Sequence, residues 1–181
     1  MPFPAHIHRR GRPGEGRGFT LPELIVVLTV TATIAAVVVP SLSSIGSTRR
    51  AAAARMIVRD LTYARERALE TGTRTWVVFS PGTNSYSVLA ENPASPGRAG
   101  AITMQDPANP GRTYVQYLNV GEYPGVLLVS ASINGGAEVG FDWLGRPLNN
   151  TEVPLSANGT ITLTGPVTVT IQRGTGLATT P

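Results

Sequence analysis

The sequence predicts an α+β fold, in which a long N-terminal α-helix packs through its second half on an antiparallel β-sheet head. Three observations predict this fold. An uncharged apolar run extends from Leu24 to Val39. A helical repeat of apolar residues follows between Ala53 and Ala68. From Thr73 onward, short runs rich in Val, Ile and Thr alternate with Gly and Pro turns, which is typical of antiparallel strands.

The composition fits one packed domain that follows a basic N-terminus. Of the 181 residues, 41% are hydrophobic and 14% are charged, which is enough apolar material for one core. All 15 basic residues are arginine, and with 11 acidic residues the net charge is +4. Four of these arginines and one glutamate place +3 of that charge in residues 1–18. The remainder is nearly neutral, which disfavours nucleic acid as a partner.

The available residue types argue against an enzyme. Cysteine is absent, and the two histidines, His6 and His8, both lie in the basic N-terminal stretch. Without lysine as well, the chain beyond residue 18 has no thiolate, imidazole or Schiff-base chemistry. Its acidic residues are scattered and form no calcium-loop pattern, and no phosphate-binding glycine loop occurs. We therefore expect no catalytic residue, no cofactor and no metal site.

The apolar run predicts a helix that spans the inner membrane. From Phe19 to Val39, about 21 residues rising 1.5 Å each cover roughly 31 Å, enough to cross the hydrocarbon core. Arginines precede the run and next occur at Arg49, so the positive-inside rule places the N-terminus in the cytoplasm and the head outside it. An ordinary cleavable signal peptide, with small residues at 32–36, is the alternative. Glu23 argues against it, because a charged side chain at a helix centre costs about 2.5–3.5 kcal/mol and serves no purpose in a signal peptide.

Residues 17–23, RGFTLPE, resemble the class III signal of type IV pilins and pseudopilins. In that family a prepilin peptidase cleaves on the cytoplasmic side, between a glycine and the apolar segment, and methylates the new N-terminus. The resemblance implies that residues 1–18 are removed by cleavage between Gly18 and Phe19, and that Phe19 is N-methylated. Glu23, then the fifth residue, would pair with the Phe19 amine of its own chain or of a neighbouring subunit and set the assembly register.

The helix is predicted to continue from Leu21 to Thr71. Pro22 is tolerated in its first turn, and Pro40 is expected to bend the helix; a break at residues 41–47 is the alternative. Residues 19–40 are assigned to the membrane or filament core, and residues 41–72 to an amphipathic second half. The face predicted to pack on the sheet carries Ala53, Ile57, Leu61, Ala64 and Ala68. The face predicted to be solvated carries Arg55, Arg59, Thr62, Glu66 and Glu70.

Residues 73–181 are predicted to form the β-rich head. The expected strands span residues 73–80, 85–90, 113–120, 125–133, 137–143, 159–164 and 167–172. A turn at residues 81–84 joins the first two as a hairpin, and Gly165-Pro166 joins the last two. Residues 91–112, rich in Pro and Gly, are predicted to be a flexible surface loop.

The aromatic residues of the head are interpreted as structural. Phe141 and Trp143 are expected to point to one face of a strand that enters a tight turn, rather than to form a ligand loop with Asp142. Trp76, Tyr114 and Tyr117 are expected in the core or rim of the sheet. Asp106, Asp142 and Glu152 lie far apart in the sequence and nominate no calcium site.

Three head segments are similar to the minor pseudopilin H and FimT-like branch of the same superfamily. They are residues 60–72 with Tyr-Ala-Arg, residues 139–147 with a Phe-x-x-x-Gly turn, and the closing segment 167–176. The resemblance implies a minor pseudopilin of a type II secretion pseudopilus, acting in filament initiation and protein secretion. Its partners would be the prepilin peptidase, other pseudopilins and the inner membrane. The alternatives are a FimT-like minor pilin of a type IV pilus, acting in adhesion, motility or DNA uptake, and an anchored or secreted β-rich binding domain.

Overall fold

The computed structural model describes residues 18–165 and 167–180, with the side chains of residues 37–44 also left undescribed. The basic leader, both histidines and Pro166 of the last predicted turn therefore lie outside the described residues. The chain divides into two compact units, Met1–Ser41 and Leu42–Pro181.

A single helix, α1, runs from Leu21 to Thr71 and passes through Pro40 as helix. Both predicted ends and the predicted continuity are confirmed. The end is set by Gly72, which has φ +65° and donates its N–H to the carbonyl of Ala68 at 3.0 Å. Glycine reaches this left-handed conformation without the cost that a Cβ would add, so it closes the last turn efficiently.

The described part of the first unit is an exposed apolar surface. Every described side chain of residues 18–36 is exposed. Among the residues that the structure describes, no helix combines the length and apolar character needed to cross a membrane. The assignment of residues 19–40 to the membrane therefore stays a prediction.

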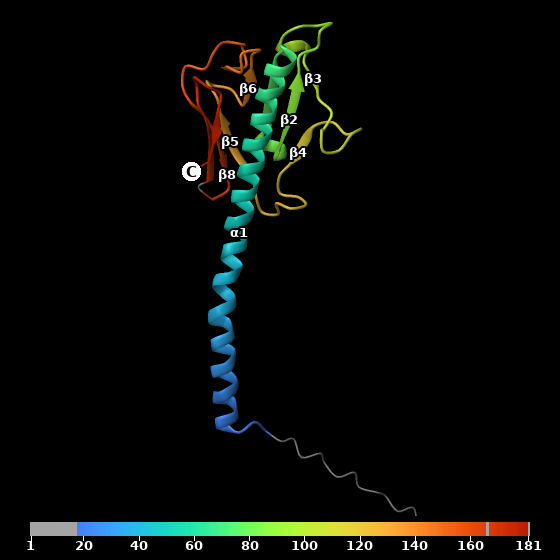
Figure 1. Cartoon of the computed structure of the whole chain (residues 1–181). Coiled ribbons are helices and arrows are strands. Elements are labelled where there is room, and N and C mark those ends of the chain that lie inside the picture. Colours follow the sequence, from blue (N-terminus) through green and yellow to red (C-terminus); the bar gives the residue numbers. More distant parts are fainter. Residues whose placement is uncertain (1–17, 166, 181) are drawn as a thin grey trace, which may run out of the picture. The chain divides into compact units, whose positions relative to one another are not determined.

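The second unit contains two antiparallel sheets, and the helical part of this unit lies across them (Figure 1). The six-stranded sheet has the order β3-β2-β1-β6-β7, with β4 also pairing with β2. Its strands are β1 (Thr75–Ser80), β2 (Ser85–Ala90), β3 (Ile102–Thr103), β4 (Val115–Tyr117), β6 (Glu138–Phe141) and β7 (Pro147–Leu148). The second sheet, ordered β10-β9-β8-β5, consists of β5 (Leu128–Ser132), β8 (Gly159–Leu163), β9 (Val167–Ile171) and β10 (Ala178–Thr179).

All seven predicted strands are present, most of them shorter than predicted. The hairpin of β1 and β2 is confirmed, with the 3-10 turn η1 (Pro81–Thr83) and a left-handed Asn84 between the strands. The two-residue strands β3, β7 and β10 were not predicted. Strand β3 and the 3-10 turn η2 (Arg98–Gly100) lie within the segment predicted to be a loop, residues 91–112.

The core joins α1 to both sheets. The five helix residues predicted to face the sheet are all 0–1% exposed, which confirms that face. They pack in one cluster with sheet residues that include Val77, Phe141, Ile161 and Ile171. The opposite face is solvated as predicted, except that Thr62 is half-buried. In Figure 1, β2, β3 and β4 lie on one side of this part of α1, and β5, β6 and β8 on the other.

The prediction that Phe141 and Trp143 share a face is wrong. Strand β6 ends at Phe141, which is fully buried, whereas Trp143 is 49% exposed. A turn begins at once, because the N–H of Gly145 donates to the carbonyl of Asp142 at 2.8 Å. The alternation of side-chain directions along a strand therefore no longer applies at Trp143. The guanidinium carbon of Arg74 lies 5.7 Å from the centre of the Trp143 ring.

Candidate functional site

The predicted cleavage site lies in an open segment ahead of the helix. Residues 18–20 have no helix or strand structure, and Phe19 is 77% exposed. A Cβ placed on Gly18 would have no neighbouring atom within 4 Å. Among the described residues, none covers the peptide bond between Gly18 and Phe19.

Glu23 lies in the first turn of α1 and contacts the residue next to the predicted new N-terminus. Its Oε2 accepts a long hydrogen bond, 3.5 Å, from the backbone N–H of Thr20. Thr20-x-x-Glu23 is a capping-box spacing, in which the glutamate satisfies a free N–H at the helix start. The sequence analysis missed this role, although the spacing would have revealed it. The contact holds the carboxylate one residue from Phe19.

The hydroxyl groups of the apolar helix segment are satisfied within the helix. Thr29, Thr31 and Thr33 each donate to the carbonyl four residues earlier, at 2.7, 2.8 and 2.5 Å. Because each hydroxyl donates to a helix carbonyl, these threonines do not need water as a hydrogen-bond acceptor. The segment is thus suited to apolar surroundings, where unsatisfied polar groups are costly.

The turn after β6 is structural, as predicted. Asp142 is 3% exposed and accepts from the N–H groups of Leu144 and Arg146, at 3.0 and 2.8 Å. It also accepts from Nε of Arg146 at 2.7 Å. These bonds use the carboxylate to hold the turn, and Gly145, at φ +72°, completes it. The Nε of Arg65 ties the turn to α1 by donating to the Gly145 carbonyl at 3.1 Å.

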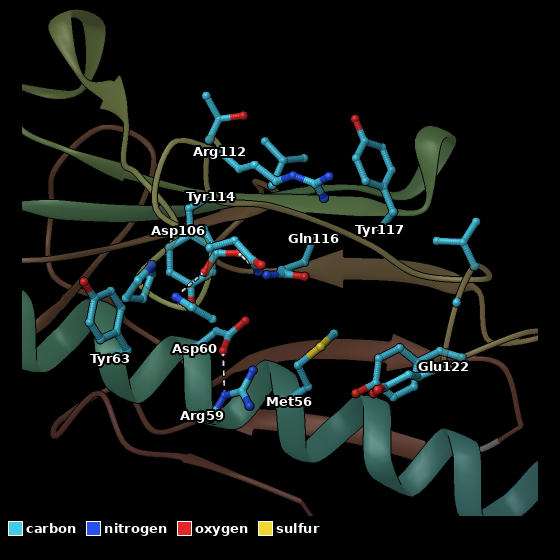
Figure 2. Close-up of a pocket in the computed structure, with 18 residues that line it drawn as sticks. Met56, Arg59, Asp60, Tyr63, Asp106, Arg112, Tyr114, Gln116, Tyr117 and Glu122 are labelled. Carbon is cyan, nitrogen blue, oxygen red and sulfur yellow. Dashed lines mark hydrogen bonds and ion pairs between the residues drawn. The ribbon is translucent and has the colours of Figure 1, made fainter.

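A cavity of about 860 Å³ lies between the second half of α1 and residues 106–123 (Figure 2). Tyrosine dominates its walls: of the five tyrosines in the chain, four line it, namely Tyr63, Tyr114, Tyr117 and Tyr123. The fifth, Tyr86, donates its hydroxyl to the cavity residue Asp60 at 2.6 Å. Residues from three separate parts of the chain therefore meet at one place.

Asp60 anchors Tyr86 beside this cavity. It is 1% exposed and accepts from Tyr86 and, at 3.0 Å, from Nε of Arg59. Burial, followed by the negative charge of Asp60, raises the pKa of Tyr86 and of Tyr114, so both stay neutral at physiological pH. The sequence analysis missed Asp60. A signal existed, because Asp60 lies three residues after Ile57 and four before Ala64, on the apolar face of the helix.

No metal-binding group of three or more histidine, cysteine or acidic residues occurs in the described part of the chain. Asp106, Asp142 and Glu152 have separate contacts: Asp106 with the N–H of Ala108, and Glu152 with Arg74 and the N–H of Arg98. The structure does not bring these three acidic residues into one site.

No family model matches the sequence, and no curated protein sequence matches it significantly. Solved structures do match. A structure of the minor pseudopilin EpsH from the type II secretion system of Vibrio cholerae aligns with a TM-score of 0.52 and 15% identity, over 73% of this chain and 94% of that one. A second EpsH structure aligns with a TM-score of 0.52 and 16% identity, over 74% of this chain and 93% of that one. The fold is that of a minor pseudopilin.

The Pseudomonas aeruginosa type IV minor pilin FimU also aligns, with a TM-score of 0.45 and 14% identity over 75% of this chain and 90% of FimU. The similarity to the EpsH structures confirms the predicted α+β fold class. The roles assigned to Gly18, Phe19 and Glu23 stay predictions.

Proposed function

We propose that this chain is a minor pseudopilin, a structural subunit of a type II secretion pseudopilus that takes part in filament initiation and protein secretion. The fold similarity to EpsH, over 94% of that chain, carries the proposal. The sequence around the Gly18–Phe19 junction supports it independently. The activity is assembly rather than catalysis, and it requires no cofactor.

Maturation begins with the prepilin peptidase. The enzyme cleaves between Gly18 and Phe19 and methylates the amine of Phe19. The exposure of Phe19 and the absence of helix across residues 18–20 support this step, because a peptidase binds its substrate in an extended form. Residues 1–18, which carry +3 of the precursor charge, orient the chain and are then lost.

The mature subunit is held in the inner membrane by residues 19–40, with its head outside the cytoplasm. The exposed apolar side chains of this segment and its internally bonded threonines support this placement. On assembly, the same surface packs against the helices of neighbouring pseudopilins. Glu23 pairs with the methylated amine of Phe19 and sets the register of the subunit.

Mass spectrometry of the membrane fraction tests maturation. We expect a mature chain that begins with N-methylated Phe19. Gly18→Ala should abolish cleavage while the head folds normally, because a Cβ at Gly18 meets no described atom within 4 Å and its obstruction arises in the peptidase. Gly82→Ala, at another open glycine, is the matched control and should be processed as wild type.

Two outcomes contradict the maturation proposal: a precursor that keeps its leader in cells with active peptidase, and a cut near residue 36, as for an ordinary signal peptide.

Deletion of the gene tests whether the chain acts in type II secretion. Loss of protein secretion is expected, whereas intact secretion with loss of pilus-dependent motility or DNA uptake would indicate the type IV pilus alternative.

A further inference from the structure

Strand β4 is an edge strand whose outer side is open. It pairs with β2 on one side, in an antiparallel register that sets Tyr117 opposite Ser85. The carbonyl of Tyr114 and the N–H of Leu118 bond toward β2, at 3.0 and 2.7 Å. Because hydrogen-bonding direction alternates along an antiparallel strand, the N–H and carbonyl of Tyr117 point away from β2. Strand β4 is short, at three residues, but it contains neither a charged residue nor proline, two of the devices that protect an edge.

The tyrosine-lined cavity lies beside this open edge. Its other wall is α1, which presents Met56, Arg59 and Tyr63 there. Figure 2 shows Gln116 pointing from β4 toward the helix and Tyr117 pointing away from it. A strand added at β4 would thus continue the six-stranded sheet, and its alternate side chains would enter the cavity. The volume of about 860 Å³ is in the range of ligand-binding sites.

Three exposed charged residues line the cavity, and two of them, Arg59 and Arg112, are positive, while the third is Glu122. Only Nε of Arg59 is bonded to Asp60, and the Arg59 side chain is 72% exposed, so its other guanidinium donors remain available. Arg112 also lines the cavity and is exposed. The carboxylates of Asp60 and Asp106 are buried and hydrogen-bonded within the protein. In Figure 2, Glu122 lies toward the end of the cavity opposite Tyr63.

We propose that the outer edge of β4 and the adjoining cavity bind an extended segment of a partner protein. The segment adds to the sheet as an antiparallel strand and places an acidic side chain at Arg59 and Arg112. The open backbone groups of Tyr117 match a polypeptide rather than a sugar, and two exposed arginines are too few for a nucleic-acid backbone. Rigid tyrosine side chains lose little entropy when they form such an interface. The proposal does not depend on filament assembly.

A library of random dodecapeptides, selected on the full chain in detergent micelles, tests this proposal. We expect the selected peptides to be enriched in Asp and Glu. Tyr117→Pro removes the outward N–H and should weaken their binding by about tenfold, the effect of one lost hydrogen bond of about 1.4 kcal/mol. Tyr117→Ala keeps that N–H and loses only the side chain, so it should weaken binding less than Tyr117→Pro does. Arg112→Glu should remove the acidic preference.

A second measurement keeps the test decisive if Tyr117→Pro lowers the thermal midpoint. The best peptide is N-methylated at each amide in turn. For strand addition, methylation should abolish binding at alternate positions only, because alternate amides face β4. The proposal is overturned by a library that yields no binder, by acidic enrichment that persists in Arg112→Glu, or by peptides whose binding is equally sensitive to methylation at every amide.

Discussion

Trp76 and Gly140 lie opposite each other in the six-stranded sheet. They are direct partners in β1 and β6, and Trp76 is fully buried. A Cβ placed on Gly140 would lie 2.7 Å from two atoms of the indole ring. The Nε1 of this indole has no hydrogen-bond partner within the described structure. The ring is thus held by packing alone, and only glycine leaves room for it.

We predict that Gly140→Ala destabilises the head. Overpacking of a filled core costs about 1–3 kcal/mol, because neither the central strand nor the buried indole can move aside. Chemical denaturation followed by tryptophan fluorescence measures the change. Gly82→Ala, where the added methyl meets open space, should leave the free energy of unfolding nearly unchanged. Equal stability of the two variants would show that the indole can shift without cost.

The buried tyrosine network predicts a loss of stability in alkaline solution. Burial and Asp60 raise the pKa of Tyr86 above the ordinary value of about 10, so the folded state holds this proton more tightly than the unfolded state does. The stabilisation is therefore complete below pH 10 and falls as the pH rises further. Thermal midpoints measured from pH 8 to about pH 11 should decline above pH 10.

Tyr86→Phe identifies the source of this decline. The variant lacks the ionisable group, so its midpoint should fall less steeply above pH 10 than that of wild type. At neutral pH it should be less stable by about 1–3 kcal/mol, because Asp60 loses a buried donor. An alkaline decline of the same steepness in both proteins would assign the effect to other groups.

At the scale of elements, the helix could be predicted and the shortest strands could not. Both ends of α1 follow from local signals, an apolar repeat and the stop at Gly72, which act within a few residues. Strands β3, β7 and β10 contain two residues each and exist because a partner strand is already in place. No local pattern of two residues encodes such pairing.

The segment predicted to be a loop illustrates the same limit. Its η2 turn is tied to distant acidic residues, because Arg98 donates from Nε and Nη2 to Glu138, at 2.9 and 2.7 Å, and from its N–H to Glu152 at 2.6 Å. Arg74 joins this network through Glu152, also at 2.6 Å. The Pro and Gly content of residues 91–112 predicts a loop, but the contacts that fix it span 40 or more residues.

One candidate site could be predicted from the sequence and the other could not. The signal at residues 17–23 is contiguous, so the sequence alone predicts Gly18, Phe19 and Glu23 as a group. The cavity has residues from α1, from residues 106–117 and from residues 120–123, and it becomes visible only in three dimensions. Asp60 was the one local clue, as a charge on an apolar helix face.

For the whole molecule, the residues that stabilise the head and those proposed to act in assembly occupy separate parts of the sequence. In the part of the chain that the structure describes, the buried hydrophobic core residues lie between Ala53 and Ile171, while every described side chain of residues 18–36 is exposed. Changes near the N-terminus should therefore leave the thermal unfolding of the head unaltered. Effects of such changes on secretion then report on processing or assembly rather than on folding.

We predict that Glu23→Ala lowers incorporation into the filament several-fold but leaves cleavage and the head intact. The variant loses the carboxylate that would pair with the Phe19 amine, so in apolar surroundings that amine lacks its counter-charge. Loss of the long capping contact to Thr20 affects the helix start alone. Quantitative immunoblots of sheared filaments measure incorporation. Glu70→Ala, an exposed carboxylate near the other end of the helix, should assemble as wild type. Equal incorporation of both variants would show that Glu23 does not set the register.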